Sequence, residues 1–176
     1  MGGTKIEIVI LDVNKEIQFR ERLPTESVKG PSHIINQILV LYEKAVSFID
    51  NSPHTIGVGS PGSLSPKTKL LRNSNTLCLN GLPLQQLIEE ALQKKIMLEN
   101  DANCFALAEA NFGAGKNHDL VFGVIMGTGC GGGFVINNNL RVGPQQITGE
   151  WGHSVINSDG PPSVSYTHLR AHETES

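Results

Sequence analysis

The stretch Lys95-Ile96-Met97-Leu98-Glu99-Asn100-Asp101-Ala102-Asn103 decides the fold, because an apolar run passes directly into a helical pattern through polar residues. Residues 95–98 predict a buried strand, and residues 102–109 predict the helix that follows it. The carboxyl end of a strand in an α/β sheet is where such folds bind ligands, so Asp101 is a candidate catalytic base. The alternative is that Asp101 only caps the helix, as aspartate often does.

The composition restricts the class of protein. The 176 residues are 39% hydrophobic and 18% charged, which is typical of one or two small globular domains. A net charge of −3, without a basic stripe or a helix-turn-helix pattern, argues against nucleic acid as a partner. The three cysteines, Cys78, Cys104 and Cys130, show no paired spacing and disfavour a disulfide framework. Without a long apolar run or a secretory leader, we expect a cytoplasmic protein with no membrane partner.

Alternating and helical apolar patterns predict further elements on both sides of the opening stretch. They are a hairpin of strands at 5–11 and 16–23, a helix at 32–49, a strand at 55–59, a helix at about 83–93 and a strand from Asp119. The glycines of residues 113–117 predict a hinge. We therefore expect an N-terminal small lobe over residues 1–115 and the start of a C-terminal large lobe over residues 118–163.

Glycine-rich turns lie near the start of both lobes. Gly127-Thr128-Gly129-Cys130-Gly131-Gly132-Gly133 separates two predicted strands, so it lacks the helix that a dinucleotide fingerprint needs. The Gly-Lys-Ser/Thr ending of a P-loop is also absent. The remaining interpretations are a tight turn without a ligand, or a turn whose N–H groups and Thr128 hydroxyl approach phosphate oxygens. Gly2-Gly3-Thr4 repeats the pattern, which favours the phosphate interpretation and suggests an internal duplication.

Gly149-Glu150-Trp151-Gly152-His153 places a carboxylate and an imidazole near glycines. Together these groups can hold neighbouring hydroxyls of a sugar, since the carboxylate accepts hydrogen bonds while the imidazole donates or accepts. A solvated acid and a surface histidine explain the same residues, and for this motif in isolation that simpler interpretation is preferred.

In combination, these motifs resemble the ROK family of sugar kinases, which have the actin-like, ribonuclease-H-like ATPase fold. The resemblance runs from Gly2 to Pro162 and includes Gly57-Val58-Gly59-Ser60-Pro61-Gly62. Five ordered motifs at the family's spacing are specific, although each alone is not. Within the family, residues 60–66, Asn73-Ser74-Asn75-Thr76 and Leu79-Asn80-Gly81 are most similar to the fructokinase and mannokinase branch.

The resemblance implies a duplicated α/β fold and ATP-dependent phosphorylation of a hexose, of the fructose, mannose or glucose type, at its primary hydroxyl. Asp101 would take the proton from that hydroxyl as it attacks the γ-phosphate. Mg²⁺ would bridge the phosphate oxygens, and the full-length protein would be a homodimer. The other implied site residues are Gly62, Asn75, Asn100, Glu150 and His153 for the sugar, and Gly3, Thr4, Lys5, Thr128 and Gly129 for the ATP phosphates.

The sequence departs from the family at both ends. The family begins with a strand ending in Asp, where this sequence has only Met1, so we expect weak binding of ATP and magnesium. After Pro162 the family continues with a Cys-x-Cys-Gly-x-x-Gly-Cys-x-Glu run, whose cysteines bind structural zinc together with the histidine at position 153. Without them, His153 would be a zinc ligand only in a full-length protein, and the second lobe would be incomplete. Residues 164–176 instead resemble the translation of a sequencing adapter, and we expect a non-native tail.

Two further functions compete with the kinase interpretation. A sugar-sensing transcriptional repressor of the same family would carry a DNA-binding extension before the sugar domain, which this sequence lacks. An actin-like ATPase with a non-sugar role would leave Glu150 and His153 without a purpose. Asp101 and the two phosphate hairpins favour the kinase, although we expect the 176 residues to be inactive alone.

Overall fold

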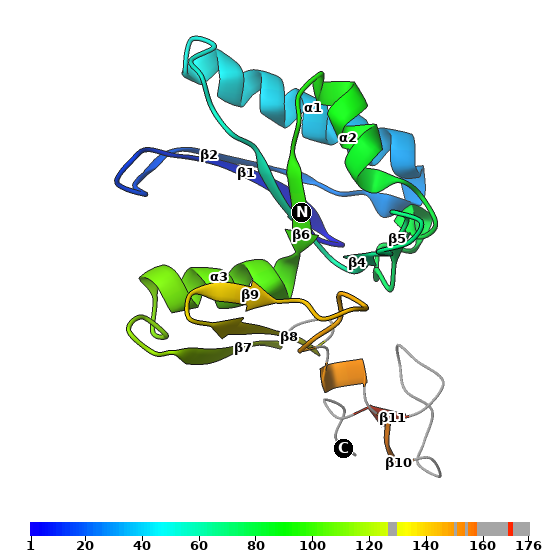
Figure 1. The fold of residues 1–176 in the computed structure, drawn as a ribbon. Helices are drawn as coiled ribbons and strands as arrows, with labels where there is room; N and C mark the ends of the chain where they lie inside the picture. The colour runs from blue at the N-terminus through cyan, green and yellow to red at the C-terminus, as the bar shows by residue number, and fades with distance from the viewer. Residues whose placement is uncertain (127–129, 150, 154, 158–168, 171–176) are drawn as a thin grey trace. The chain divides into compact units, whose positions relative to one another are not determined.

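The computed structural model describes residues 1–126, 130–149, 151–153, 155–157 and 169–170 (Figure 1). The chain forms two compact units, Met1–Asn100 and Asp101–Ser176. The sequence predicted instead a small lobe over residues 1–115 and a large lobe that begins at residue 118. This division into lobes remains a prediction. The difference concerns α3 (Asp101–Phe112), which packs on strands of the second unit. Among the described residues, no helix combines the length and the apolar character needed to cross a membrane.

Three pairs of strands lie in the first unit. The antiparallel pair β1 (Lys5–Leu11) and β2 (Ile17–Pro24) confirms the predicted hairpin. The parallel pair β3 (Gly57–Ser60) and β6 (Met97–Asn100) sets Ser60 opposite Asn100. The third pair is β4 (Ser63–Leu64) with β5 (Leu71–Arg72), and it is antiparallel. The carboxyl ends of β3 and β6 therefore meet at one edge.

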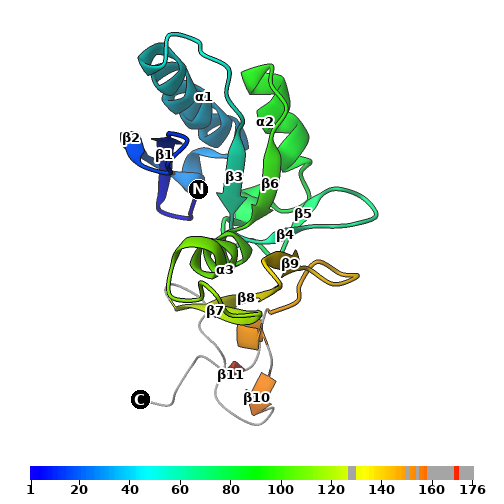
Figure 2. The ribbon, with the colours of Figure 1, turned by 60° about the vertical axis from the view of Figure 1, so that its left-hand side comes forward.

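Two helices lie side by side in the first unit, and the first of them packs on β1 and β2 (Figure 2). The first, α1 (Pro31–Phe48), begins with proline at its first position, where the missing N–H has no helical partner to lose. The second, α2 (Leu84–Leu92), buries one face of leucine and isoleucine. Both helices confirm the sequence-based expectation. Short 3₁₀ turns at Ser27–Lys29 and Leu77–Leu79 connect them to the neighbouring strands.

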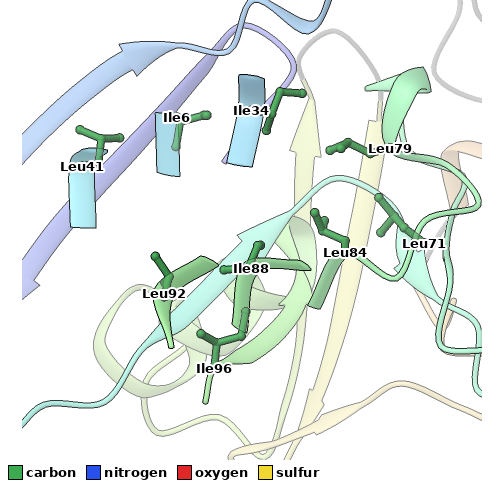
Figure 3. Close-up of a cluster of buried hydrophobic side chains, with 9 residues drawn as sticks. All are labelled: Ile6, Ile34, Leu41, Leu71, Leu79, Leu84, Ile88, Leu92 and Ile96. Carbon is green, nitrogen blue, oxygen red and sulfur yellow. The ribbon is translucent and has the colours of Figure 1, made fainter. Parts of the chain in front are cut away.

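One apolar core holds the first unit together (Figure 3). Its buried members are Ile6, Ile34, Leu41, Leu71, Leu79, Leu84, Ile88, Leu92 and Ile96. Each such side chain contributes about 1.5–3 kcal/mol when it leaves water. Val58 of β3 and Leu98 of β6 pack against this core, so it anchors the two strands whose ends carry Ser60 and Asn100.

The second unit is a helix on an antiparallel sheet. Its strands β7 (Leu120–Met126), β8 (Cys130–Ile136) and β9 (Asn139–Arg141) pair in chain order. Helix α3 packs on β7 and β8. The rings of Phe122 and Phe134 are stacked, with their centroids 4.5 Å apart. A 3₁₀ turn at Trp151–His153 and the short strands β10 (Val155–Asn157) and β11 (Leu169–Arg170) follow. The predicted adapter-derived tail, residues 164–176, lies outside the described residues except for β11.

The glycine-rich turn predicted over residues 127–133 was wrong in its second half. Gly131, Gly132 and Gly133 belong to β8 and pair with β7, with Gly132 opposite Val124. Glycine is needed in this sheet because α3 approaches closely. A Cβ atom on Gly123 would lie 2.7 Å from the Cα atom of Ala106, and one on Gly133 would lie 2.9 Å from its Cβ atom. Residues 127–129 lie outside the described part.

Candidate functional site

Asn100 ends β6, and its side chain holds the loop that follows β3. Its Nδ2 donates a hydrogen bond to the Gly62 carbonyl oxygen at 3.0 Å, and Asn100 is 6% exposed. Gly62 has a φ of +83°, and a Cβ atom there would lie 2.5 Å from the carbonyl oxygen of Arg72 and 2.9 Å from the Ser74 nitrogen. The structure therefore brings together Gly62 and Asn100, two of the residues predicted to bind sugar.

The loop that carries Asn75 is braced by its own side chains. Asn80 accepts a hydrogen bond from the Ser74 N–H and donates one to the Ser74 carbonyl, both at 2.9 Å. The Ser74 hydroxyl accepts a hydrogen bond from the Thr76 N–H at 3.1 Å. Ser74 and Thr76 are buried while Asn75 is exposed between them. In the sequence, Asn80 was notable only as part of the family resemblance. Its role in bracing the loop became visible only in the structure.

Asn75 also lies beside the first predicted phosphate turn. A Cβ atom on Gly3 would lie 3.7 Å from Asn75 Oδ1, which is ordinary contact distance. Gly3 and Asn75 were predicted for different ligands, phosphate and sugar, and the structure places them next to each other. The two roles, which remain predictions, would need this proximity, because phosphoryl transfer brings the phosphate and the accepting hydroxyl together.

The Gly2–Lys5 turn offers free backbone donors. The Gly2 N–H donates to the Lys5 carbonyl at 2.8 Å, which closes the turn. Gly3, Thr4 and Lys5 are exposed, and the N–H groups of Gly3 and Thr4 donate to no atom of the described residues. Consecutive free N–H groups in a turn are a common anion-binding arrangement, and the phosphate role of Gly3, Thr4 and Lys5 remains a prediction.

Asp101 is the first residue of α3 and is exposed. Its Oδ1 accepts a hydrogen bond from the N–H of Ala102 at 2.9 Å. A capping side chain also accepts hydrogen bonds from N–H groups of the first helical turn, so the capping alternative stands beside the catalytic interpretation. Because Asp101 directly follows Asn100, the chain itself places the candidate base next to the residue that holds the Gly62 loop.

The other predicted motif packs on the start of β8. Gly149 has a φ of +94°, and a Cβ atom there would lie 2.5 Å from the Gly132 carbonyl oxygen. A Cβ atom on Gly152 would overlap the carbonyl oxygen of Cys130. The two glycines thus permit the backbones to touch, which the sequence interpretation missed. Glu150, Thr128 and Gly129 lie outside the described residues, and the structure describes only the backbone of His153, so their predicted roles remain predictions.

The described residues contain no group of three or more His, Cys, Asp or Glu side chains arranged to hold a metal ion. Cys78, Cys104 and Cys130 are not in disulfides. We therefore assign no protein ligands to magnesium, and the predicted zinc role of His153 remains a prediction.

Comparisons with known proteins agree with this geometry. The chain matches the ROK family over residues 1–165. It is 35% identical over 153 residues to an N-acetyl-D-glucosamine kinase of Yersinia pestis, covering 87% of this chain and 59% of that protein. It is 35% identical over 157 residues to the N-acetyl-D-glucosamine kinase of Pasteurella multocida, covering 89% of this chain and 51% of that protein. The chain thus spans little more than half the length of these relatives.

Solved structures give the same result. A ROK family glucokinase from Streptomyces griseus, crystallised with glucose and AMPPNP, superposes with a TM-score of 0.78 at 28% identity, covering 97% of this chain and 53% of that one. The ROK hexokinase from Thermus thermophilus has the same TM-score and identity and is covered over 56% of its chain. These neighbours confirm the predicted α/β fold class, the actin-like ATPase fold.

Proposed function

The chain belongs to the ROK family, and from this premise we propose that it supplies the sugar-binding and part of the phosphate-binding surface of an ATP-dependent hexose kinase. The observation that carries the proposal is the hydrogen bond from Asn100 to Gly62, followed along the chain by Asp101. The amide of Asn100 and the Gly62 loop are suited to bind sugar hydroxyls, and the next residue in the chain carries a carboxylate suited to take a proton.

In the proposed reaction, the Asp101 carboxylate accepts the proton of the primary hydroxyl as that oxygen attacks the γ-phosphorus of ATP. The new O–P bond forms while the bond to the bridging oxygen breaks, and ADP leaves with the electron pair. The N–H groups of Gly3 and Thr4 hold phosphate oxygens, and magnesium bound to ATP offsets their charge. Asn75, Asn100 and Gly62 hold and orient the sugar. We propose the same for Glu150 and His153, and we propose a phosphate role for Lys5, Thr128 and Gly129.

The sugar is a hexose whose exact identity depends on pocket shape. The loop residues 73–81 favour fructose or mannose through their resemblance to that branch. The relatives named above are N-acetyl-D-glucosamine kinases, so N-acetylglucosamine and glucose belong in the same comparison. A difference of one methylene changes specificity by about 10–200-fold, and loss of a hydroxyl that the site hydrogen-bonds changes it by about 10⁴–10⁵-fold, so close relatives differ in preferred sugar. Dimerisation of the full protein also remains a proposal.

The test is a coupled ADP-release assay on the full gene product with fructose, mannose, glucose and N-acetylglucosamine. We expect hexose-dependent ADP release that is lost in Asp101→Asn. The Asp101→Asn protein should still bind the sugar, since the amide keeps the shape of the carboxylate. If ADP release does not depend on any hexose, the proposal is overturned. If fructose and mannose are the poorest substrates, only the branch assignment is overturned.

A further inference from the structure

Thr25 anchors the first phosphate turn from the end of β2. It is completely buried, with 0% of its surface exposed. Its backbone N–H donates to the Thr4 carbonyl at 3.0 Å, and its hydroxyl donates to the Gly2 carbonyl at 2.6 Å. Both bonds engage carbonyl oxygens of the turn and leave the N–H groups of Gly3 and Thr4 available.

The residue after Thr25 is itself fixed in an unusual conformation. Glu26 has a φ of +47°, in the left-handed region that non-glycine residues seldom adopt. Its carboxylate binds Lys29 Nζ at 2.7 Å and His33 Nε2 at 2.9 Å, and these contacts, the Lys29 hydrogen bond foremost, hold the pKa of Glu26 below its ordinary value. The 3₁₀ turn and the start of α1 therefore secure the segment that carries Thr25.

We propose that Thr25 is a positioning residue for the nucleotide phosphates, an inference that rests on the proposed function. By holding the carbonyls of Gly2 and Thr4, it orients the intervening N–H groups before the anion arrives. A turn so oriented binds phosphate without first losing conformational freedom. Thr25 acts only through the turn and does not touch the substrate.

Two substitutions separate the hydroxyl from the shape of the side chain. Thr25→Val keeps the branched shape and the backbone N–H but removes the hydroxyl donor. Thr25→Ser keeps the donor. Ile88→Val is the matched control, because it removes a methyl group from a side chain of α2 that is also 0% exposed. It lowers stability without touching the turn.

The measurement is amide NMR on the 176-residue chain, titrated separately with ATP plus magnesium chloride and with glucose. We expect ATP to shift the Gly3 and Thr4 amides, with affinity about tenfold weaker in Thr25→Val, as loss of a buried hydrogen bond implies. Thr25→Ser and Ile88→Val should stay within about twofold of the unchanged chain, a small fraction of that effect. Glucose-dependent shifts at Asn75 should be the same in all four proteins.

Equal ATP affinity in Thr25→Val and the unchanged chain would overturn the role of Thr25 alone. So would an equal loss in Ile88→Val, or a matching loss of the glucose response, because both indicate general destabilisation. If ATP leaves Gly3 and Thr4 unshifted in the unchanged chain, the phosphate site of the proposed function fails, and the role of Thr25 fails with it.

Discussion

Replacing Gly62 with alanine should be the most damaging single-methyl change in the first unit. An alanine at a φ of +83° is strained by about 1–2 kcal/mol. Its Cβ atom would also lie 2.5 Å from the Arg72 carbonyl oxygen, well inside the ordinary contact distance of 3.4 Å. That contact is with backbone and cannot be relieved by a rotamer change, and such overpacking costs about 1–3 kcal/mol. We expect Gly62→Ala to lower the free energy of unfolding by about 2–5 kcal/mol.

Two other glycines of the same unit separate strain from overlap. Gly81 has a φ of +80° but nothing within 4 Å of an added Cβ atom, so Gly81→Ala should show only the strain, about 1–2 kcal/mol. Gly57 has neither feature, and Gly57→Ala should be neutral or stabilise by about 0.4–1 kcal/mol. Urea unfolding followed by circular dichroism ranks the three variants. A cost for Gly62→Ala no greater than that for Gly81→Ala would refute the close packing of the Gly62 loop.

Three further predictions concern the base, the second unit and pH. Asp101→Asn should lower kcat by about 10²–10⁴-fold in the ADP-release assay while the hexose KM changes little; an unchanged kcat would exclude a base at this position. Gly123→Ala should cost the second unit about 1–3 kcal/mol by overlap with Ala106, which hydrogen exchange of the β7 amides measures; unchanged protection would mean that α3 is not closely packed. The lowered pKa of Glu26 means that its ion pairs stabilise the fold fully above the ordinary value of 4.5 and are lost as the pH falls through the lowered value. Urea midpoints from about pH 6 to about pH 3 should therefore decline less in Glu26→Gln, and parallel curves would contradict this.

Local patterns predicted most elements because their residues satisfy local and tertiary preferences at once. The helix from Pro31 to Phe48 has both the apolar spacing and an initial proline, and the hairpin of β1 and β2 flanks a recognisable turn. The strand that ends at Asn100 was predicted within two residues. These segments could be predicted without knowing which other segments they pack against.

Features that depend on close approach between distant segments escaped prediction. Glycines 131–133 were expected in a turn, because glycine serves turns and close contacts equally well and the sequence does not name the partner. The roles of Gly149 and Gly152 against β8 were hidden for the same reason. Thr25 carries no motif at all, since its importance lies in two hydrogen bonds to main-chain oxygens more than twenty residues away.

The proposed sugar site is built by Gly62, Asn75 and Asn100, and amide NMR of the 176-residue chain during hexose titration tests it most directly. We expect saturable shifts of these three amides with at least one of fructose, mannose, glucose and N-acetylglucosamine. We also expect Asn100→Ala to abolish them, while Asn36→Ala, at an exposed position of α1, leaves them unchanged. Absence of shifts with all four sugars, or shifts that persist in Asn100→Ala, would contradict it.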